Sequence, residues 1–145
     1  MPPIGPAQHY LREALAWKPA GPGNTVLLIE DEESIAQMLL IIFSRAGLAV
    51  LWASNGAEGL RLFEQNRRNI ALAFVDCHLP DLEGSEICRR LRATAPGLPV
   101  MLTSGREQQA APRWLAATGP TAFVARPYLP TDLVGHMRTL LRPAA

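Results

Sequence analysis

The stretch IALAFVDCHLPDLEG, residues 70–84, contains the transition that decides the fold of this chain. An apolar run, residues 70–75, ends at the carboxylate of Asp76, and a proline, further acidic residues and a glycine follow. A short run that is apolar throughout, without alternation, is typical of a strand buried on both faces of a parallel sheet. The run therefore predicts a central strand whose carboxyl end presents Asp76.

Strand-like and helix-like segments alternate along the chain from Thr25 onward. Segments with helical periodicity follow each strand-like run, which makes five strand–helix units. This order predicts an α/β fold in which a doubly wound, five-stranded parallel sheet carries helices on both faces. The apolar runs with the length of strands occupy residues 25–29, 48–53, 70–75, 99–103 and 121–125.

The expected helices differ in how clearly the sequence marks them. The helix over 34–46 has an apolar face and ends at Gly47, whereas Asn55 supplies an N-cap for the second helix. A weaker helix is expected over 106–118, interrupted by Pro112, and Pro130 opens the last helix. The face of the first helix consists of Ile35, Met38, Leu39, Ile42, Phe43 and Ala46.

Residues 1–24 differ in composition from the rest of the chain. They contain five prolines around one short helix-like segment, so we expect an N-terminal extension or linker, a domain over 25–142 and a tail over 143–145. The formal net charge of +1 gives no reason to expect nucleic acid or a membrane surface as a partner. No apolar segment has the length of a signal peptide or membrane span, and Cys77 and Cys88 lack a metal-ligand spacing, so the cytoplasm is the expected compartment.

Polar residues follow four of the five predicted strands in a way that suits phosphoryl chemistry. Glu30 and Asp31 follow the first strand, Asp76 follows the third, Thr103 ends the fourth, and Arg126 follows the fifth. In an open α/β sheet, ligands bind beyond the carboxyl ends of the strands, where the winding reverses. The flavodoxin-like strand order 2-1-3-4-5 makes the first and third strands neighbours at that point, so we expect the three acids to meet there.

Three crowded carboxylates repel one another unless a cation lies between them. Mg²⁺ favours carboxylate, carbonyl and water oxygens, so we expect it to bind the three acids. Asp76 is then placed as a nucleophile toward a phosphoryl group, and the hydroxyl and the cation after the fourth and fifth strands would stabilise the transferred oxygens. Taken singly, each residue has a plainer explanation, such as a turn acid; for Glu32 and Glu33 we expect little more than a charge at a helix N-terminus.

This set of residues resembles the receiver domain of bacterial two-component response regulators, over about residues 25–142. The matching motifs are LLIEDEESI for the acidic pair, LAFVDCHLPDLEG for the acceptor, PVMLTS for the switch strand and GPTAFVARPY for the last strand. The resemblance implies that Asp76 accepts the phosphoryl group. It also implies that Mg²⁺ is held by Asp76, Glu30, Asp31 and the backbone carbonyl of His78.

The resemblance also assigns a switch and a catalytic cation. Thr103 is the hydroxyl residue, Ser104 is the small residue after it, and Phe123 takes the aromatic switch position. Phosphorylation of Asp76 would draw Thr103 inward and let Phe123 follow into the vacated space. The chain departs from the family pattern at Arg126, where the family normally has lysine, and at Phe123, where tyrosine is frequent.

The function implied is that of a signalling receiver and not of an enzyme with a separate substrate. A sensor histidine kinase or a phosphotransfer protein would donate the phosphoryl group, and the domain would catalyse at most its own phosphoryl transfer and dephosphorylation. Because the sequence ends soon after the last predicted helix, we expect no effector domain to follow it. We therefore expect output through a partner of unknown identity, a homodimer, or a domain outside this sequence, without direct nucleic-acid binding; the responding surface would be the fourth helix, fifth strand and fifth helix.

Three alternatives stand beside this interpretation. Arg126 suits a pseudo-receiver, which is a protein-binding module that no longer depends on phosphate. A phosphatase of the haloacid dehalogenase type needs a second acid two residues after the nucleophile, where this chain has His78. A flavin-binding flavodoxin would place a phosphate at the first loop, EDEES, whose acidic residues repel it.

Overall fold

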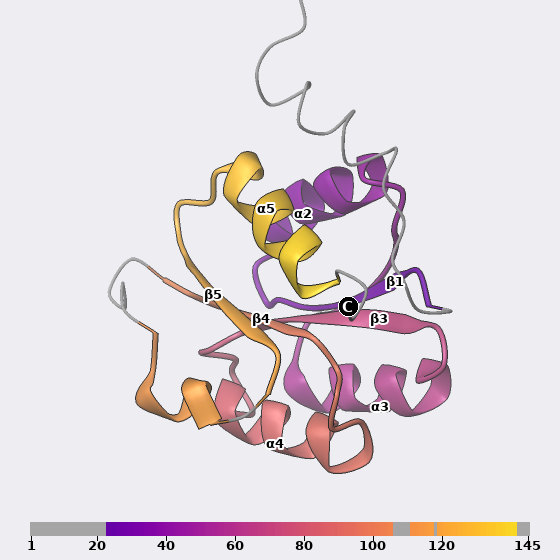
Figure 1. Ribbon diagram of the computed structural model, residues 1–145, viewed down its shortest axis with the longest axis vertical. Helices are drawn as coiled ribbons and strands as arrows, with labels where there is room; N and C mark the ends of the chain where they lie inside the picture. The colour runs from indigo at the N-terminus through magenta and orange to yellow at the C-terminus, as the bar shows by residue number, and fades with distance from the viewer. Residues whose placement is uncertain (1–22, 106–110, 118, 142–145) are drawn as a thin grey trace, which may run out of the picture.

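The computed structural model describes residues 23–105, 111–117 and 119–141, and the predicted extension up to residue 22 and the tail lie outside them. A five-stranded sheet separates two layers of helices, with α2 and α5 on one face and α3 and α4 on the other (Figure 1). In chain order the elements are β1 (Thr25–Ile29), α2 (Glu33–Arg45), β2 (Ala49–Ala53), α3 (Gly56–Asn66), β3 (Ile70–Asp76), α4 (Gly84–Thr94), β4 (Val100–Ser104), the 3₁₀-helix η1 (Arg113–Ala117), β5 (Thr121–Ala125) and α5 (Pro130–Leu140).

The sheet confirms the predicted architecture. Its strands are parallel and run in the order β2-β1-β3-β4-β5, which is the flavodoxin-like order expected from the sequence. The register pairs Ile29 at the end of β1 with Val75 in β3, and Asp76 at the end of β3 with Thr103 in β4. The ends of these three strands therefore lie next to one another.

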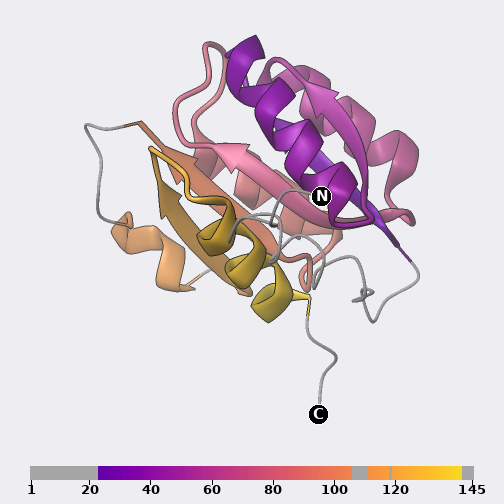
Figure 2. The ribbon, with the colours of Figure 1, turned by 90° about the horizontal axis from the view of Figure 1, so that it is seen from above.

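Two apolar clusters, one on each face of the sheet, explain why the strands are apolar throughout. The first lies under α2 and α5 and includes Phe43, Phe74 and Met137, all fully buried. The second lies above α3 and α4 and includes Val75 and Leu91. Successive strand residues point to opposite faces, so β3 needs an apolar residue at nearly every position. Figure 2, seen from above, shows α2 and α5 together in front of the sheet.

Most of the predicted helix boundaries are confirmed by local contacts. The side chain of Asn55 accepts the N–H of Glu58 at 2.8 Å and caps α3, and Gly47 follows α2 with a φ of +84°. The predicted face of α2 was wrong at one edge, because Met38 is 39% exposed. Ala36, which the prediction omitted, is buried in its place, since it lies nearer the middle of the stripe formed with residues 39, 42 and 43.

The α-helix predicted over 106–118 was wrong where the structure describes it. Residues 113–117 form the 3₁₀-helix η1, begun by the N–H of Leu115 bonding to the carbonyl of Pro112, while 106–110 and 118 lie outside the described residues. A 3₁₀ turn is common in a segment this short, and it allows Leu115 to pack on the second cluster. Within the described residues, no helix has the length and apolar character needed to cross a membrane.

Candidate functional site

The carboxyl ends of β1 and β3 bring three acids together, as the sequence predicted. Glu30 and Asp31 directly follow β1, and Asp76 is the last residue of β3. One carboxylate oxygen from each residue lies within 4.8 Å of the others. Glu30 and Asp76 are buried, whereas Asp31 is exposed at the rim. The cluster therefore has a closed inner side and one side open to solvent.

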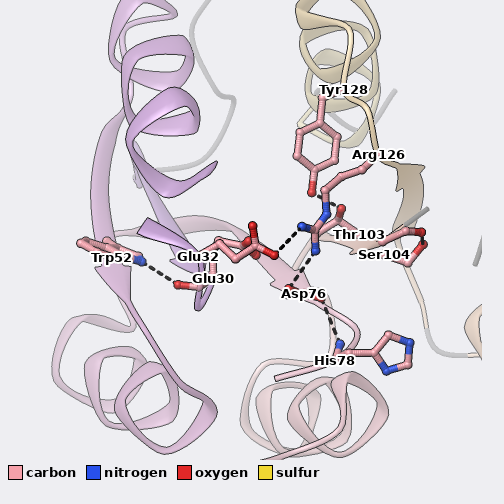
Figure 3. Close-up of polar contacts among 10 residues, drawn as sticks. Glu30, Glu32, Trp52, Asp76, His78, Thr103, Ser104, Arg126 and Tyr128 are labelled. Carbon is pink, nitrogen blue, oxygen red and sulfur yellow. Dashed lines mark hydrogen bonds and ion pairs between the residues drawn. The ribbon is translucent and has the colours of Figure 1, made fainter. Parts of the chain in front are cut away.

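Glu30 is the deepest of the three acids. It is fully buried, and neither of its carboxylate oxygens has a hydrogen-bond partner among the residues that the structure describes. Burial, followed by the side chain of the neighbouring Asp76, raises the pKa of Glu30 from 4.5 to about 8. Its backbone is held in place by Trp52 of β2, whose indole N–H donates to the Glu30 carbonyl at 2.8 Å (Figure 3).

Asp76 has two different partners, one for each carboxylate oxygen. The backbone N–H of His78 donates to Oδ1 at 3.0 Å, and Nη2 of Arg126 donates to Oδ2 at 3.3 Å. Burial raises the pKa of Asp76, while the His78 N–H and the guanidinium oppose the rise by favouring the carboxylate. The side chain is 2% exposed, so these contacts act with little screening by water.

Arg126 spans the mouth of the acidic cluster from the end of β5. Its Nη1 lies 3.2 Å from Oε1 of Glu32, and its Nη2 contacts Asp76, so one guanidinium joins an exposed acid to a buried one (Figure 3). The interpretation of Glu32 as little more than a helix-terminal charge was therefore incomplete. Glu32 does occupy the N-cap position of α2, but its side chain makes no capping bond.

Thr103 and Phe123 lie on opposite faces of the sheet. Thr103 is fully buried, and its hydroxyl is hydrogen-bonded to the phenol hydroxyl of Tyr128 (Figure 3). Tyr128 packs against the first cluster, whereas Phe123 packs against the second. The sequence did not single out Tyr128, which is the last residue of the motif GPTAFVARPY. The available signal was the hydroxyl on the Tyr128 ring, two positions after Arg126, since a buried tyrosine hydroxyl usually has a hydrogen-bond partner.

The loop after β3 returns to the strand that it leaves. The N–H of Gly84 bonds to the carbonyl of Cys77 at 2.9 Å, and a Cβ on Gly84 would approach the Cys77 Cα to 2.9 Å. Asp81 in the same loop accepts the N–H groups of Gly56 and Ala57 at 2.8 and 2.9 Å, which ties it to the N-terminus of α3. Asp76 is therefore followed by a loop with a defined shape.

Comparison with known proteins shows the family to which this fold belongs. The family model described as the response regulator receiver domain matches residues 26–138, which is most of the chain and includes all of the residues discussed above. The chain belongs to the response regulator receiver domain family.

Relatives of this receiver domain are signalling proteins. The transcriptional regulatory protein CreB of Escherichia coli is 34% identical over 120 residues, which are 82% of this chain and 51% of CreB. The sensory transduction protein RegX3 of Mycolicibacterium smegmatis is 30% identical over 122 residues, 84% of this chain and 52% of RegX3. The receiver domain thus spans about half the length of these curated relatives.

Two solved structures support the same assignment. A putative response regulator from Chloroflexus aurantiacus is 25% identical and superposes with a TM-score of 0.74, covering 83% of this chain and 99% of that one. A receiver domain protein from Clostridium thermocellum, also 25% identical, has a TM-score of 0.70 and covers 81% and 93% of the two chains. Both TM-scores show that these proteins share the fold in Figure 1, a sheet between two layers of helices.

The acidic cluster of this receiver domain fits a hard divalent cation. The two oxygens of Glu30 are buried without a hydrogen-bond partner in the described part of the chain, a costly arrangement that a bound cation would relieve. Asp31 offers a further oxygen from the open side. The imidazole of His78 is not part of the cluster: it is exposed, and its Nδ1 lies 3.8 Å from Glu83. The role of the His78 carbonyl as a ligand stays a prediction.

Proposed function

We propose that this receiver domain accepts a phosphoryl group on Asp76 from a sensor histidine kinase or a phosphotransfer protein, in the cytoplasm and with Mg²⁺ bound. The observation that carries the proposal is the environment of the Asp76 carboxylate. It is 2% exposed, lies against a guanidinium, and stands beside two further acids at adjoining strand ends. A lone buried carboxylate would be costly, so this grouping favours a chemical role over a structural one.

In the proposed reaction, a carboxylate oxygen of Asp76 attacks the phosphorus atom of the donor. A new oxygen–phosphorus bond forms as the bond to the leaving group breaks, and the leaving group keeps the electron pair and takes up a proton from solvent or from the donor protein. Bound Mg²⁺ would neutralise negative charge on the phosphoryl oxygens during the transfer. Glu30 and Asp31 would hold that cation together with Asp76 and the His78 carbonyl.

Arg126 and the His78 N–H have separate tasks in this scheme. The N–H fixes the orientation of Asp76 through Oδ1, which positions the attacking group before the donor arrives. Arg126 already contacts Oδ2, so it has only to shift by a short distance to pair with an oxygen of the new phosphoryl group. The domain would thereby catalyse its own phosphorylation and dephosphorylation, without a separate substrate.

Thr103 and Phe123 are the proposed route from the site to the surface. Thr103 is the partner of Asp76 in the strand register, so the two side chains lie next to each other on one face of the sheet. Phe123 is partly exposed on β5, and a shift there would alter the surface of η1, which lies within the predicted fourth helix, β5 and α5. We propose this surface as the place where an output partner, or a second copy of the chain, binds without direct contact to nucleic acid.

The ion pair of Arg126 with both Glu32 and Asp76 favours a second candidate function. A pseudo-receiver would keep one conformation through such a contact and bind its partner without phosphate. The two candidates differ in whether Asp76 is chemically competent, because the first requires uptake of phosphate and the second does not.

The test is incubation of the chain with acetyl phosphate, with and without Mg²⁺, followed by intact mass measurement. The proposal predicts the mass of one added phosphoryl group that requires Mg²⁺, and a Mg²⁺-dependent change in the fluorescence of Trp52, whose indole touches Glu30. No added mass, with Trp52 fluorescence that still responds to a purified partner protein, would favour the pseudo-receiver instead.

A further inference from the structure

The phenol of Tyr128 is hydrogen-bonded to the Thr103 hydroxyl, on which the proposed switch depends. It is the hydrogen-bond partner of the Thr103 hydroxyl within the described part of the chain, and the two residues are 25 positions apart. Thr103 is fully buried at the end of β4, and Tyr128 lies beyond β5, five positions after Phe123. The contact therefore links the switch strand to the segment that enters α5.

The ring of Tyr128 is fixed by packing, so its hydroxyl has a defined place. It stands edge-on to Phe74, with ring centroids 6.0 Å apart and an angle of 82° between planes. Phe74 in turn packs edge-on against Phe43 of α2 at 5.7 Å. Such aromatic pairs contribute favourably beyond the apolar area they bury, and this row anchors the ring to the first cluster. The phenol oxygen then marks a fixed point beside Thr103.

The phenol is able to keep this contact throughout the physiological pH range. Burial raises the pKa of Tyr128 well above its ordinary value, so the ring keeps its proton and stays neutral. Arg126 lies close by but offers no acceptor, because a guanidinium only donates. The Thr103 hydroxyl is therefore the acceptor or donor that Tyr128 uses in this buried position.

A threonine hydroxyl occupies one staggered position at a time. Asp76 and Thr103 are register partners on neighbouring strands, and Phe74, on which Tyr128 packs, lies two residues before Asp76 on the same face. The Thr103 hydroxyl thus has Tyr128 as its present partner, and an oxygen of a phosphoryl group on Asp76 would be a second one. Turning toward that oxygen means breaking or stretching the bond to Tyr128.

We propose that Tyr128 is a positioning residue that holds Thr103 in its resting rotamer, so that a phosphoryl group on Asp76 must compete with the phenol for the Thr103 hydroxyl. This inference rests on the proposed function, since it concerns the same phosphoryl site. It adds a residue that sets how readily the site responds. Phe123 would report the movement of Thr103, whereas Tyr128 opposes it.

The test compares Tyr128→Phe with the parent. Phenylalanine keeps the ring and its contact with Phe74 and removes only the hydroxyl. Uptake from acetyl phosphate and the affinity for beryllofluoride, a phosphoryl analogue, should both rise, by about two- to tenfold, the range expected when one neutral hydrogen bond is removed from the resting state alone. Thermal melting shows whether the variant is folded.

A double-mutant cycle separates a contact with Thr103 from a general effect on packing. In a Thr103→Val background, Tyr128→Phe should have no further effect, because the hydroxyl that it restrains is gone. In a Thr103→Ser background the effect should return, since serine keeps the hydroxyl. A purely structural role of Tyr128 would lower stability equally in all three backgrounds and would not depend on residue 103.

The outcomes distinguish this inference from the proposed function. If the parent takes up no phosphoryl group and binds no beryllofluoride, the proposed function fails, and the role of Tyr128 fails with it. If the parent is phosphorylated and Tyr128→Phe is equal to it or slower, the inference alone is overturned. An effect of Tyr128→Phe that persists undiminished beside Thr103→Val also overturns it.

Discussion

Replacing Arg126 by lysine should speed phosphoryl uptake by Asp76. The guanidinium now contacts two carboxylates at once, Glu32 at 3.2 Å and Asp76 at 3.3 Å, and must leave at least one of them to meet an incoming phosphoryl group. A lysine ammonium is a compact point charge that lacks the fork needed for both contacts. The variant keeps the positive charge that the transferred oxygens require and loses the outer anchor.

The size of the effect follows from the exposure of the two acids. The Glu32 side chain is 57% exposed, so its ion pair contributes about 0–1 kcal/mol, which corresponds to at most about a fivefold change in rate. The contact with Asp76 is buried, and the reaction needs the positive charge there, so loss of that charge should lower the rate of uptake by more than loss of the Glu32 contact raises it. Removing the charge with Arg126→Met should slow uptake by about a hundredfold, as loss of a preorganised donor to a transition state does.

The assay is the initial rate of uptake from acetyl phosphate at saturating Mg²⁺. Glu32→Gln frees Arg126 without altering it, and should also raise the rate by no more than about fivefold. Glu33→Gln is the matched control, because Glu33 is a neighbouring exposed acid whose side chain bonds to Gln37 instead. The reasoning is refuted if Arg126→Lys and Glu32→Gln are both indistinguishable from the parent, or if Glu33→Gln gives the same increase.

Two further predictions concern stability. Glu30→Gln should flatten the pH dependence of unfolding in Mg²⁺-free buffer. The pKa of Glu30 is raised from 4.5 to about 8, so between these values the folded parent keeps a proton that the unfolded chain releases. The free energy of unfolding of the parent should therefore fall as pH rises through this interval. Urea titrations across that interval check this, and an equal slope in both proteins would contradict it. Asp81→Ala should lower the free energy of unfolding by about 1–2 kcal/mol, because Gly56 and Ala57 lose the acceptor at the N-terminus of α3. Asp81→Asn keeps one acceptor, so its free energy of unfolding should fall by less. An unchanged urea midpoint in Asp81→Ala would show that the contact contributes nothing to stability.

The strand order and the meeting of the three acids were predictable because they follow from backbone periodicity. The run over 70–75 is apolar at every position, which is typical of a strand in a sheet covered on both faces, and the end of that run places Asp76 at the end of the strand. Asn55 marks a helix start through its bond with the N–H of Glu58, and Pro130 marks one through its fixed φ in the first turn. Signals of this kind are local, so a single sequence contains them.

Contacts that depend on side-chain rotamers across the sheet were not predictable in the same way. Arg126 lies 94 positions from Glu32, and nothing in either motif selects Glu32 over Asp31 as the outer partner. The bond between Tyr128 and Thr103 likewise depends on a ring orientation that Phe74 fixes from another strand. These contacts join residues that are far apart in the sequence and that come together only in the folded sheet.

The most direct measurement of the central claim is the position of phosphoryl incorporation in the parent and in Asp76→Asn. The amide is nearly isosteric with the carboxylate but a much poorer nucleophile, and it removes a charge beside Glu30, so the thermal midpoint in Mg²⁺-free buffer should hold or rise. The account predicts one Mg²⁺-dependent phosphoryl group on the parent peptide that contains Asp76, normal uptake in the Asp81→Asn control, and none in Asp76→Asn. Undiminished uptake by folded Asp76→Asn, or a phosphoryl group mapped to a peptide without Asp76, would contradict the account.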